Sequence, residues 1–265
     1  MAPGDRSGAG EPRPSARRRS LPRPLLTAER HREAYFFLFG LLLFNIFFLA
    51  IAKAGRWQTF VIVVLVAATL MLALRTSEAR RVTQRVATIA AALAVLMALA
   101  VAVTNSTSLT GYMYLVLVAL LVLSPLAIGR RILTSRKVTL NTLVAALCVY
   151  LMIGLLFTFL YLAMNTLHPD FFAQGRQTDP SVYLYFSYIT MTTVGFGDFT
   201  PASNVPRAAV VFEAIIGQIF LVTAVARLVS LYSAQEPGPG AGLEDVESDA
   251  EGVPSDETPG IDGGD

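Results

Sequence analysis

The stretch Thr193-Val194-Gly195-Phe196-Gly197-Asp198 decides how the rest of this 265-residue chain is interpreted. On its own, a Gly-x-Gly sequence is typical of a turn, because glycine adopts positive φ at little steric cost. The segment before it, Ser181 to Thr192, is aromatic-rich and about three helical turns long, too short to cross a bilayer. A long apolar run from Pro206 to about Tyr232 follows. A short helix, a glycine loop and a spanning helix together predict a re-entrant loop, since irregular backbone is tolerated at membrane depth only where it is buried or lines a water path.

The composition indicates an integral membrane protein. Hydrophobic residues make up 54% of the chain and charged residues 15%, whereas a soluble protein has about 25% charged residues. A spanning helix needs about 20 apolar residues, and six runs approach or reach that length. We therefore expect an all-α membrane protein with six transmembrane helices and a re-entrant pore helix and loop between the fifth and sixth. The predicted spans are Ala34–Ala52, Trp57–Leu74, Val86–Val103, Tyr112–Ile128, Val138–Leu162 and Pro206–Tyr232.

Basic residues predict the orientation, because cytoplasmic loops carry an excess of Lys and Arg. With both termini in the cytoplasm, 17 basic residues lie inside and four lie outside. Arginine far outnumbers lysine and alanine is abundant, which favours a GC-rich bacterial genome. Together with the predicted spans, this composition predicts a multi-pass protein of the plasma membrane, which in a bacterium is the inner membrane. The four outside residues are Lys53, Arg56, Arg176 and Arg207.

The charge distribution divides the chain into four regions. Residues 1–30 form a basic tail and residues 234–265 an acidic tail, both predicted to be disordered and cytoplasmic because they lack apolar periodicity. Residues 31–137 form a four-helix transmembrane region, and residues 138–233 form the module that holds the outer helix, pore helix, filter loop and last helix. The basic tail either contacts anionic lipid or only enforces topology.

The stretch from Tyr183 to Tyr232 resembles the pore module of the potassium channel superfamily, in particular bacterial one-pore channels. The sequence from Thr193 to Asp198 matches the filter of that superfamily, with Thr192 as the preceding Thr and Pro201 just beyond. The six-helix order resembles the voltage-gated layout more loosely.

The resemblance implies a binding path for potassium. The backbone carbonyls of Thr193, Val194, Gly195 and Phe196 would replace the hydration shell of the ion, and Asp198 would attract cations at the outer mouth. One loop cannot surround an ion, so the resemblance implies a homotetramer. We expect potassium ions, membrane lipid and identical subunits as partners, no nucleic acid, and no cofactor besides the permeant ion.

The same resemblance assigns supporting residues. Tyr185 and Phe186 would form the aromatic cuff around the filter. Gly217 lies where many of these channels carry a hinge, although close packing against the pore helix is an equal alternative. Four residues recur at helical spacing on one face of the last helix: Gln218, Val222, Val225 and Val229. They would line the pore and its gate. The alternative is that this face only packs against neighbouring helices.

Two features depart from the resemblance. Phe196 replaces the commoner Tyr and removes a hydroxyl that could bond the cuff, so we expect a less rigid outer filter. The fourth predicted span, Tyr112–Ile128, contains no Arg or Lys, whereas steep voltage gating needs three or four charges in each subunit. We therefore expect a channel that is not steeply voltage-gated.

Glu213 is the one carboxylate inside a predicted span. Such residues are costly and have a polar partner or a water contact, so Glu213 would either brace the pore helix or tune the cavity.

Three other functions stay open from the sequence. A weakly selective cation channel of the same fold is the first alternative to a potassium-selective one. A potassium transporter subunit is a second, although such subunits carry four pore loops in one chain and this chain has one. A membrane enzyme is the third, but the two histidines, His31 and His168, have no acid–base or ligand cluster near them in sequence.

Overall fold

The computed structural model describes residues 23–53, 55–76, 81–104, 106–134, 140–168 and 171–233. These residues form seven α-helices, and their only β pairing is an isolated antiparallel bridge between Phe172 and Pro201. The helices are α1 (Arg23–Ala50), α2 (Arg56–Thr76), α3 (Arg81–Thr104), α4 (Thr107–Thr134), α5 (Leu140–Leu167), α6 (Pro180–Met191) and α7 (Asn204–Ser233).

Five helices in the described residues are long and apolar enough to cross a membrane: α2, α3, α4, α5 and α7. The apolar part of α1 is shorter, Ala34–Ala50, because the first third of that helix carries charged residues such as Arg30 and Glu33. The span predicted for α1 therefore stays a prediction. The helical and multi-span character of the chain is confirmed.

Several predicted boundaries differ from the structure. Helices α3 and α4 each begin five residues earlier than predicted, at Arg81 and Thr107. Residues 23–30, assigned to a disordered tail, belong to α1, since Arg23-Pro24 can open a helix without the amide that Pro lacks. Helix α5 continues to Leu167, five residues beyond the predicted end, because its sequence contains no proline before that point. Residues 1–22, the acidic tail from 234 onward and the predicted border at 137–138 lie outside the described residues.

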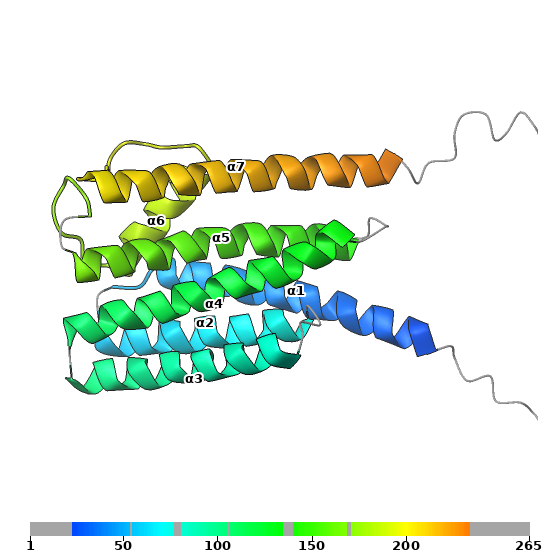
Figure 1. The fold of residues 1–265 in the computed structure, drawn as a ribbon, viewed down its shortest axis with the longest axis horizontal. Helices are drawn as coiled ribbons and strands as arrows, with labels where there is room; N and C mark the ends of the chain where they lie inside the picture. The colour runs from blue at the N-terminus through cyan, green and yellow to red at the C-terminus, as the bar shows by residue number, and fades with distance from the viewer. Residues whose placement is uncertain are drawn as a thin grey trace, which may run out of the picture.

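The six long helices run side by side along one axis, and α6 covers only one end of them (Figure 1). The start of α1 and the end of α7 lie at the end opposite α6 (Figure 1). Helices α2, α3 and α4 pack on one another, α5 packs against α4, and α1 contacts α2, α5 and α6.

Among the five spans, that of α5 is the most buried and that of α7 the least. Within the described residues α7 packs against α5 and α6 alone, and 11% of its span is buried compared with 67% of the α5 span. An apolar helix with so little internal cover has most of its surface available to other chains or to lipid.

Candidate functional site

The loop after α6 has a backbone that alternates in conformation. Positive φ angles occur at Thr193 (63°), Gly195 (49°) and Gly197 (79°), separated by residues without positive φ. Glycine tolerates this region, whereas a β-branched threonine there is an outlier held in place by its surroundings. Thr193 follows the last turn of α6, and its amide donates to the carbonyl of Thr190 at 3.0 Å, so helix termination supplies that constraint.

The amides of this loop point back to the helix. Val194 and Gly195 both donate to the carbonyl of Ile189, at 2.9 and 3.1 Å. Within the described residues, the carbonyls of residues 193–196 accept no hydrogen bond. The amides of residues 193–195 are used within the chain. The carbonyls of residues 193–196 can bind something outside it, because a backbone carbonyl needs a partner.

Tyr185 connects the loop to the pore helix. Its ring lies parallel to that of Phe196, with centroids 6.4 Å apart and an angle of 5° between the planes. Its hydroxyl lies close enough to the Asp198 carboxylate for the negative charge of that group to act on it. The ring also meets Phe199 edge-on. Tyr185 therefore packs on the loop 193–198, and its support of a filter stays a prediction.

Phe186 lies elsewhere than the cuff prediction placed it. It is buried and packs in a cluster with Tyr161 of α5 and with Phe171 and Phe172, which precede α6. A residue one position from Tyr185 is rotated by about 100° around a helix, so the two rings cannot both face the loop. Phe186 therefore anchors α6 to α5.

The segments on either side of the pore helix are tied together. Ala173 donates to the carbonyl of Thr200 at 2.8 Å, and Ala202 donates to that of Phe171 at 2.9 Å. The Gln174 side chain adds two bonds to Thr200, one to its amide and one to its hydroxyl. This pairing fixes the chain immediately after Asp198 to the chain that enters α6.

Glu213 of α7 is fully buried where three helices meet. Its Oε2 accepts a hydrogen bond from the Tyr161 hydroxyl of α5 at 2.5 Å, and its Oε1 lies 2.5 Å from Ser187 Oγ of α6. Ser187 Oγ is also 2.8 Å from the carbonyl oxygen of Gly154 in α5. The bracing role considered for Glu213 is supported by these contacts, because the carboxyl group joins α5, α6 and α7.

Two glycines allow this close approach. A Cβ added to Gly217 would lie 2.6 Å from Met191 Cγ, and one added to Gly154 would lie 2.7 Å from the Tyr188 ring. Gly217 sits inside continuous α-helix, so the structure favours close packing against the pore helix over a bent hinge.

Gln218 also meets the end of the pore helix. It is half-buried and its side-chain amide donates to the carbonyl of Met191 at 3.3 Å. The predicted gate residues Val222, Val225 and Val229 are exposed on α7. Their exposure in one chain suits either a pore face or contact with another subunit.

Several residues of this site were not singled out from the sequence: Gly154, Tyr161, Phe171, Phe172, Ser187 and Phe199. The isolated intramembrane carboxylate Glu213 signalled that polar partners exist, but nothing in a single sequence says that they are Ser187 and Tyr161. The aromatic pair at 171–172 was a visible signal for packing under the loop.

Comparisons with known proteins match this part of the chain. Residues 145–234 match the family described as Ion channel. A segment of 89 residues, 33% of this chain, is 36% identical to Two-pore potassium channel 2 of Arabidopsis thaliana, and the match spans 18% of that protein's length. The family match begins within α5 and includes α6, the loop 193–198 and α7. With the five apolar spans, it indicates a multi-pass membrane protein, one segment of which is similar to ion channels.

Proposed function

We propose that the chain is one subunit of a homotetrameric potassium-selective channel, with residues 193–198 of four copies forming the filter. The observation that carries the proposal is the alternation of positive φ at Thr193, Gly195 and Gly197. Together with amides that donate back to α6, this backbone leaves a row of carbonyls for an ion. Carbonyl oxygens in such a row replace the hydration shell of potassium.

The need for several copies is supported by the surface of one chain. Residues 192–198 are exposed, Phe196 at 70%, although three of them have positive φ and four of their amides donate to carbonyls of α6. Helix α7 is largely uncovered. Both features fit an axis shared by four identical subunits, where α7 and the loop of each copy would be covered by the others.

The contacts behind the loop would make the filter stiff. Tyr185 stacks on Phe196, the 171–173 segment holds Thr200 and Ala202, and Glu213 joins the helices underneath. A preorganised ring of oxygens favours one ion because the ligands cannot rearrange for another.

A second candidate, a weakly selective cation channel of the same fold, is favoured by one observation. Phe196 contacts Tyr185 through ring faces alone, since phenylalanine has no hydroxyl to donate. The outer filter would then depend on stacking, worth about 0.5–1.5 kcal/mol, where a hydrogen bond would add directional restraint.

Voltage is a weak candidate for the gating stimulus. The described part of α4 that precedes Arg130 carries no basic residue, and each gating charge contributes only roughly 2.3 kcal/mol per 100 mV. We propose passive conduction with both termini on the cytoplasmic side, in the plasma membrane.

Potassium efflux from liposomes tests this proposal, with Gly195→Ala as the variant and Gly175→Ala as its matched control. Both glycines have positive φ, 49° at Gly195 and 91° at Gly175, and an added Cβ would meet no atom within 4 Å at either position. Gly175 takes the less favourable angle for an L residue, so the control carries at least as much backbone strain as the variant. We expect wild type and Gly175→Ala to release potassium and to cross-link as tetramers, and Gly195→Ala to assemble without releasing it. Equal efflux from both variants would contradict the role of the loop.

A further inference from the structure

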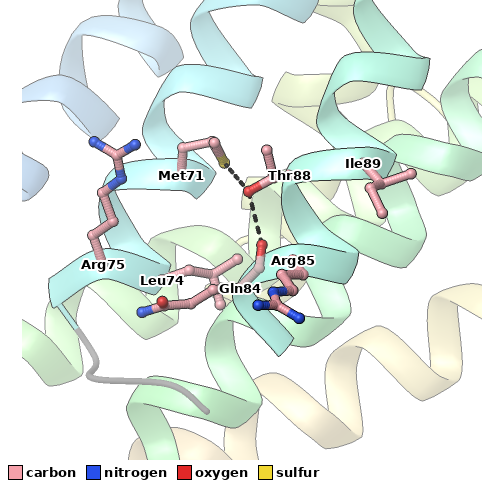
Figure 2. Close-up of a pocket in the computed structure, with 7 residues that line it drawn as sticks. All are labelled: Met71, Leu74, Arg75, Gln84, Arg85, Thr88 and Ile89. Carbon is pink, nitrogen blue, oxygen red and sulfur yellow. Dashed lines mark hydrogen bonds between the residues drawn. The ribbon is translucent and has the colours of Figure 1, made fainter. Parts of the chain in front are cut away.

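A second feature lies at the opposite end of the molecule from the loop. A pocket of about 530 Å³ opens between the end of α2 and the start of α3, within the range of ligand sites. Figure 2 shows the residues that line it. Helix α2 contributes Met71, Leu74 and Arg75, and helix α3 contributes Gln84, Arg85 and Ile89.

The pocket is amphiphilic: its apolar residues lie inside the membrane spans, and its two arginines lie at the ends of those spans. The apolar spans extend from Trp57 to Arg75 in α2 and from Val82 to Thr104 in α3. Met71 and Leu74 therefore lie inside one span, whereas Arg75 closes it, and Arg85 lies in the first turn of the other. Cations at the end of two spans, above apolar walls, are placed where phospholipid phosphates meet hydrocarbon.

The charge of the pocket is not neutralised within its own helices. Arg75 and Arg85 are exposed, and the sequences of α2, α3, α4 and α5 contain no Asp or Glu. Thr88 is engaged with the carbonyl of Gln84 at 2.8 Å and with the Met71 sulfur, as the dashed lines of Figure 2 indicate. The charged groups left to meet a ligand are the two guanidinium groups, which only donate, and the Gln84 side-chain amide adds one NH₂ donor and one carbonyl acceptor.

An apolar path continues from the pocket along α3. Val82, Val86, Ile89, Leu93 and Leu96 are exposed and recur at spacings of four and three residues, so they form one stripe. Ile89, 69% exposed, belongs both to the pocket and to the stripe. A ligand that contacts both the two arginines and the apolar stripe has an anionic head group and a hydrocarbon tail.

We propose that this pocket binds one anionic phospholipid, its phosphate held by Arg75 and Arg85 and an acyl chain lying along the α3 stripe. The lipid would join the ends of α2 and α3 in the peripheral helices. The same phosphate chemistry exists in free phosphate, but free phosphate makes no use of the stripe. The proposal does not depend on ion conduction, so it is tested by binding alone.

Native mass spectrometry of the full chain in detergent, titrated with dioleoyl phosphatidylglycerol, tests the site. Each basic residue near a membrane surface contributes roughly fivefold to the affinity for anionic lipid. We expect Arg75→Gln/Arg85→Gln to weaken phosphatidylglycerol binding on the order of 25-fold. The control Lys53→Gln/Arg207→Gln removes two exposed cations at the other end of the helices and should leave the affinity unchanged. Arg75→Lys/Arg85→Lys, which keeps the charge, should retain most of it.

Three results would overturn the proposal. One is wild-type affinity in the Gln double variant with a normal circular dichroism spectrum. Another is equal affinity of the wild type for dioleoyl phosphatidylcholine, which has no net charge. The third is displacement of phosphatidylglycerol by inorganic phosphate at the same concentration, which would make the site one for a free anion. If the Gln double variant does not fold, the lipid and phosphate comparisons on the wild type still decide.

Discussion

The proton count around Ser187 makes a sharp prediction about Glu213. A serine hydroxyl has one hydrogen, yet Ser187 Oγ lies within hydrogen-bonding distance of two acceptors, the Gly154 carbonyl at 2.8 Å and Glu213 Oε1 at 2.5 Å. Both contacts are satisfied if Ser187 donates to Gly154 and a neutral Glu213 carboxyl group donates to Ser187. A neutral carboxyl also avoids the cost of burying a charge in a spanning helix.

Glutamine reproduces this pattern of donors and acceptors. In Glu213→Gln, the amide NH₂ would donate to Ser187 and the amide oxygen would accept from Tyr161. No hydrogen bond is lost, so we expect the free energy of unfolding to change by less than about 1 kcal/mol.

Alanine removes both interactions. In Glu213→Ala, two hydrogen bonds worth about 1 kcal/mol each are lost, and the buried Tyr161 hydroxyl is left without its acceptor at a cost of about 1–3 kcal/mol. We expect a total loss of roughly 3–5 kcal/mol, which corresponds to a fall in melting temperature on the order of 10 °C.

Thermal unfolding of the detergent-solubilised protein, followed by circular dichroism, measures both variants. Thr223→Ala, at an exposed polar position of the same helix, is the matched control and should change stability by less than about 0.5 kcal/mol. A Gln variant as unstable as the Ala variant would refute the neutral carboxyl group. An Ala variant with wild-type stability and tetramer yield but altered conductance would refute the bracing role.

Three further predictions follow from the site. Gly217→Ala and Gly154→Ala each introduce a Cβ less than 3 Å from a side chain of α6, so we expect each to lose about 1–3 kcal/mol of stability in the same thermal assay, and unchanged melting would contradict the close packing. Phe196→Tyr supplies a hydroxyl beside Tyr185 and should raise the potassium-to-sodium permeability ratio in bilayer recordings, whereas a lower ratio would contradict the stacking account of the outer filter. Arg130→Gln/Arg131→Gln should leave the conductance–voltage relation unshifted, and a shift would show that these residues sense voltage.

The helical fold was largely readable from the sequence because apolar runs of spanning length are local features. The short segment before Thr193 was identified as a half-length helix by its length alone, and the positive φ of Gly195 and Gly197 follows from residue type. The polar start of α1 was misassigned, since charged residues also occur in helices that extend beyond an apolar span.

The contacts within the site could not be read in the same way, because they join residues far apart in the chain. A carboxylate inside an apolar span, Glu213, indicates polar partners. Those partners, Tyr161 and Ser187, lie 52 and 26 positions away in the sequence, so they could not be identified from it. Phe186 was placed in the cuff because it is aromatic and adjacent to Tyr185, and helix geometry sends it to the other side. Gln218 was assigned to the cavity from its face of α7, which stays a prediction, and its bond to the Met191 carbonyl at the end of α6 could not be foreseen.

The reversal potential of the reconstituted channel tests the central claim most directly. The purified chain would be placed in a planar bilayer with potassium on one side and sodium on the other, at equal concentration. We predict a reversal displaced toward the potassium equilibrium potential by more than about 59 mV, the value for a tenfold preference between singly charged species. A clear current that reverses near zero would mean that the loop passes both ions and would contradict potassium selectivity.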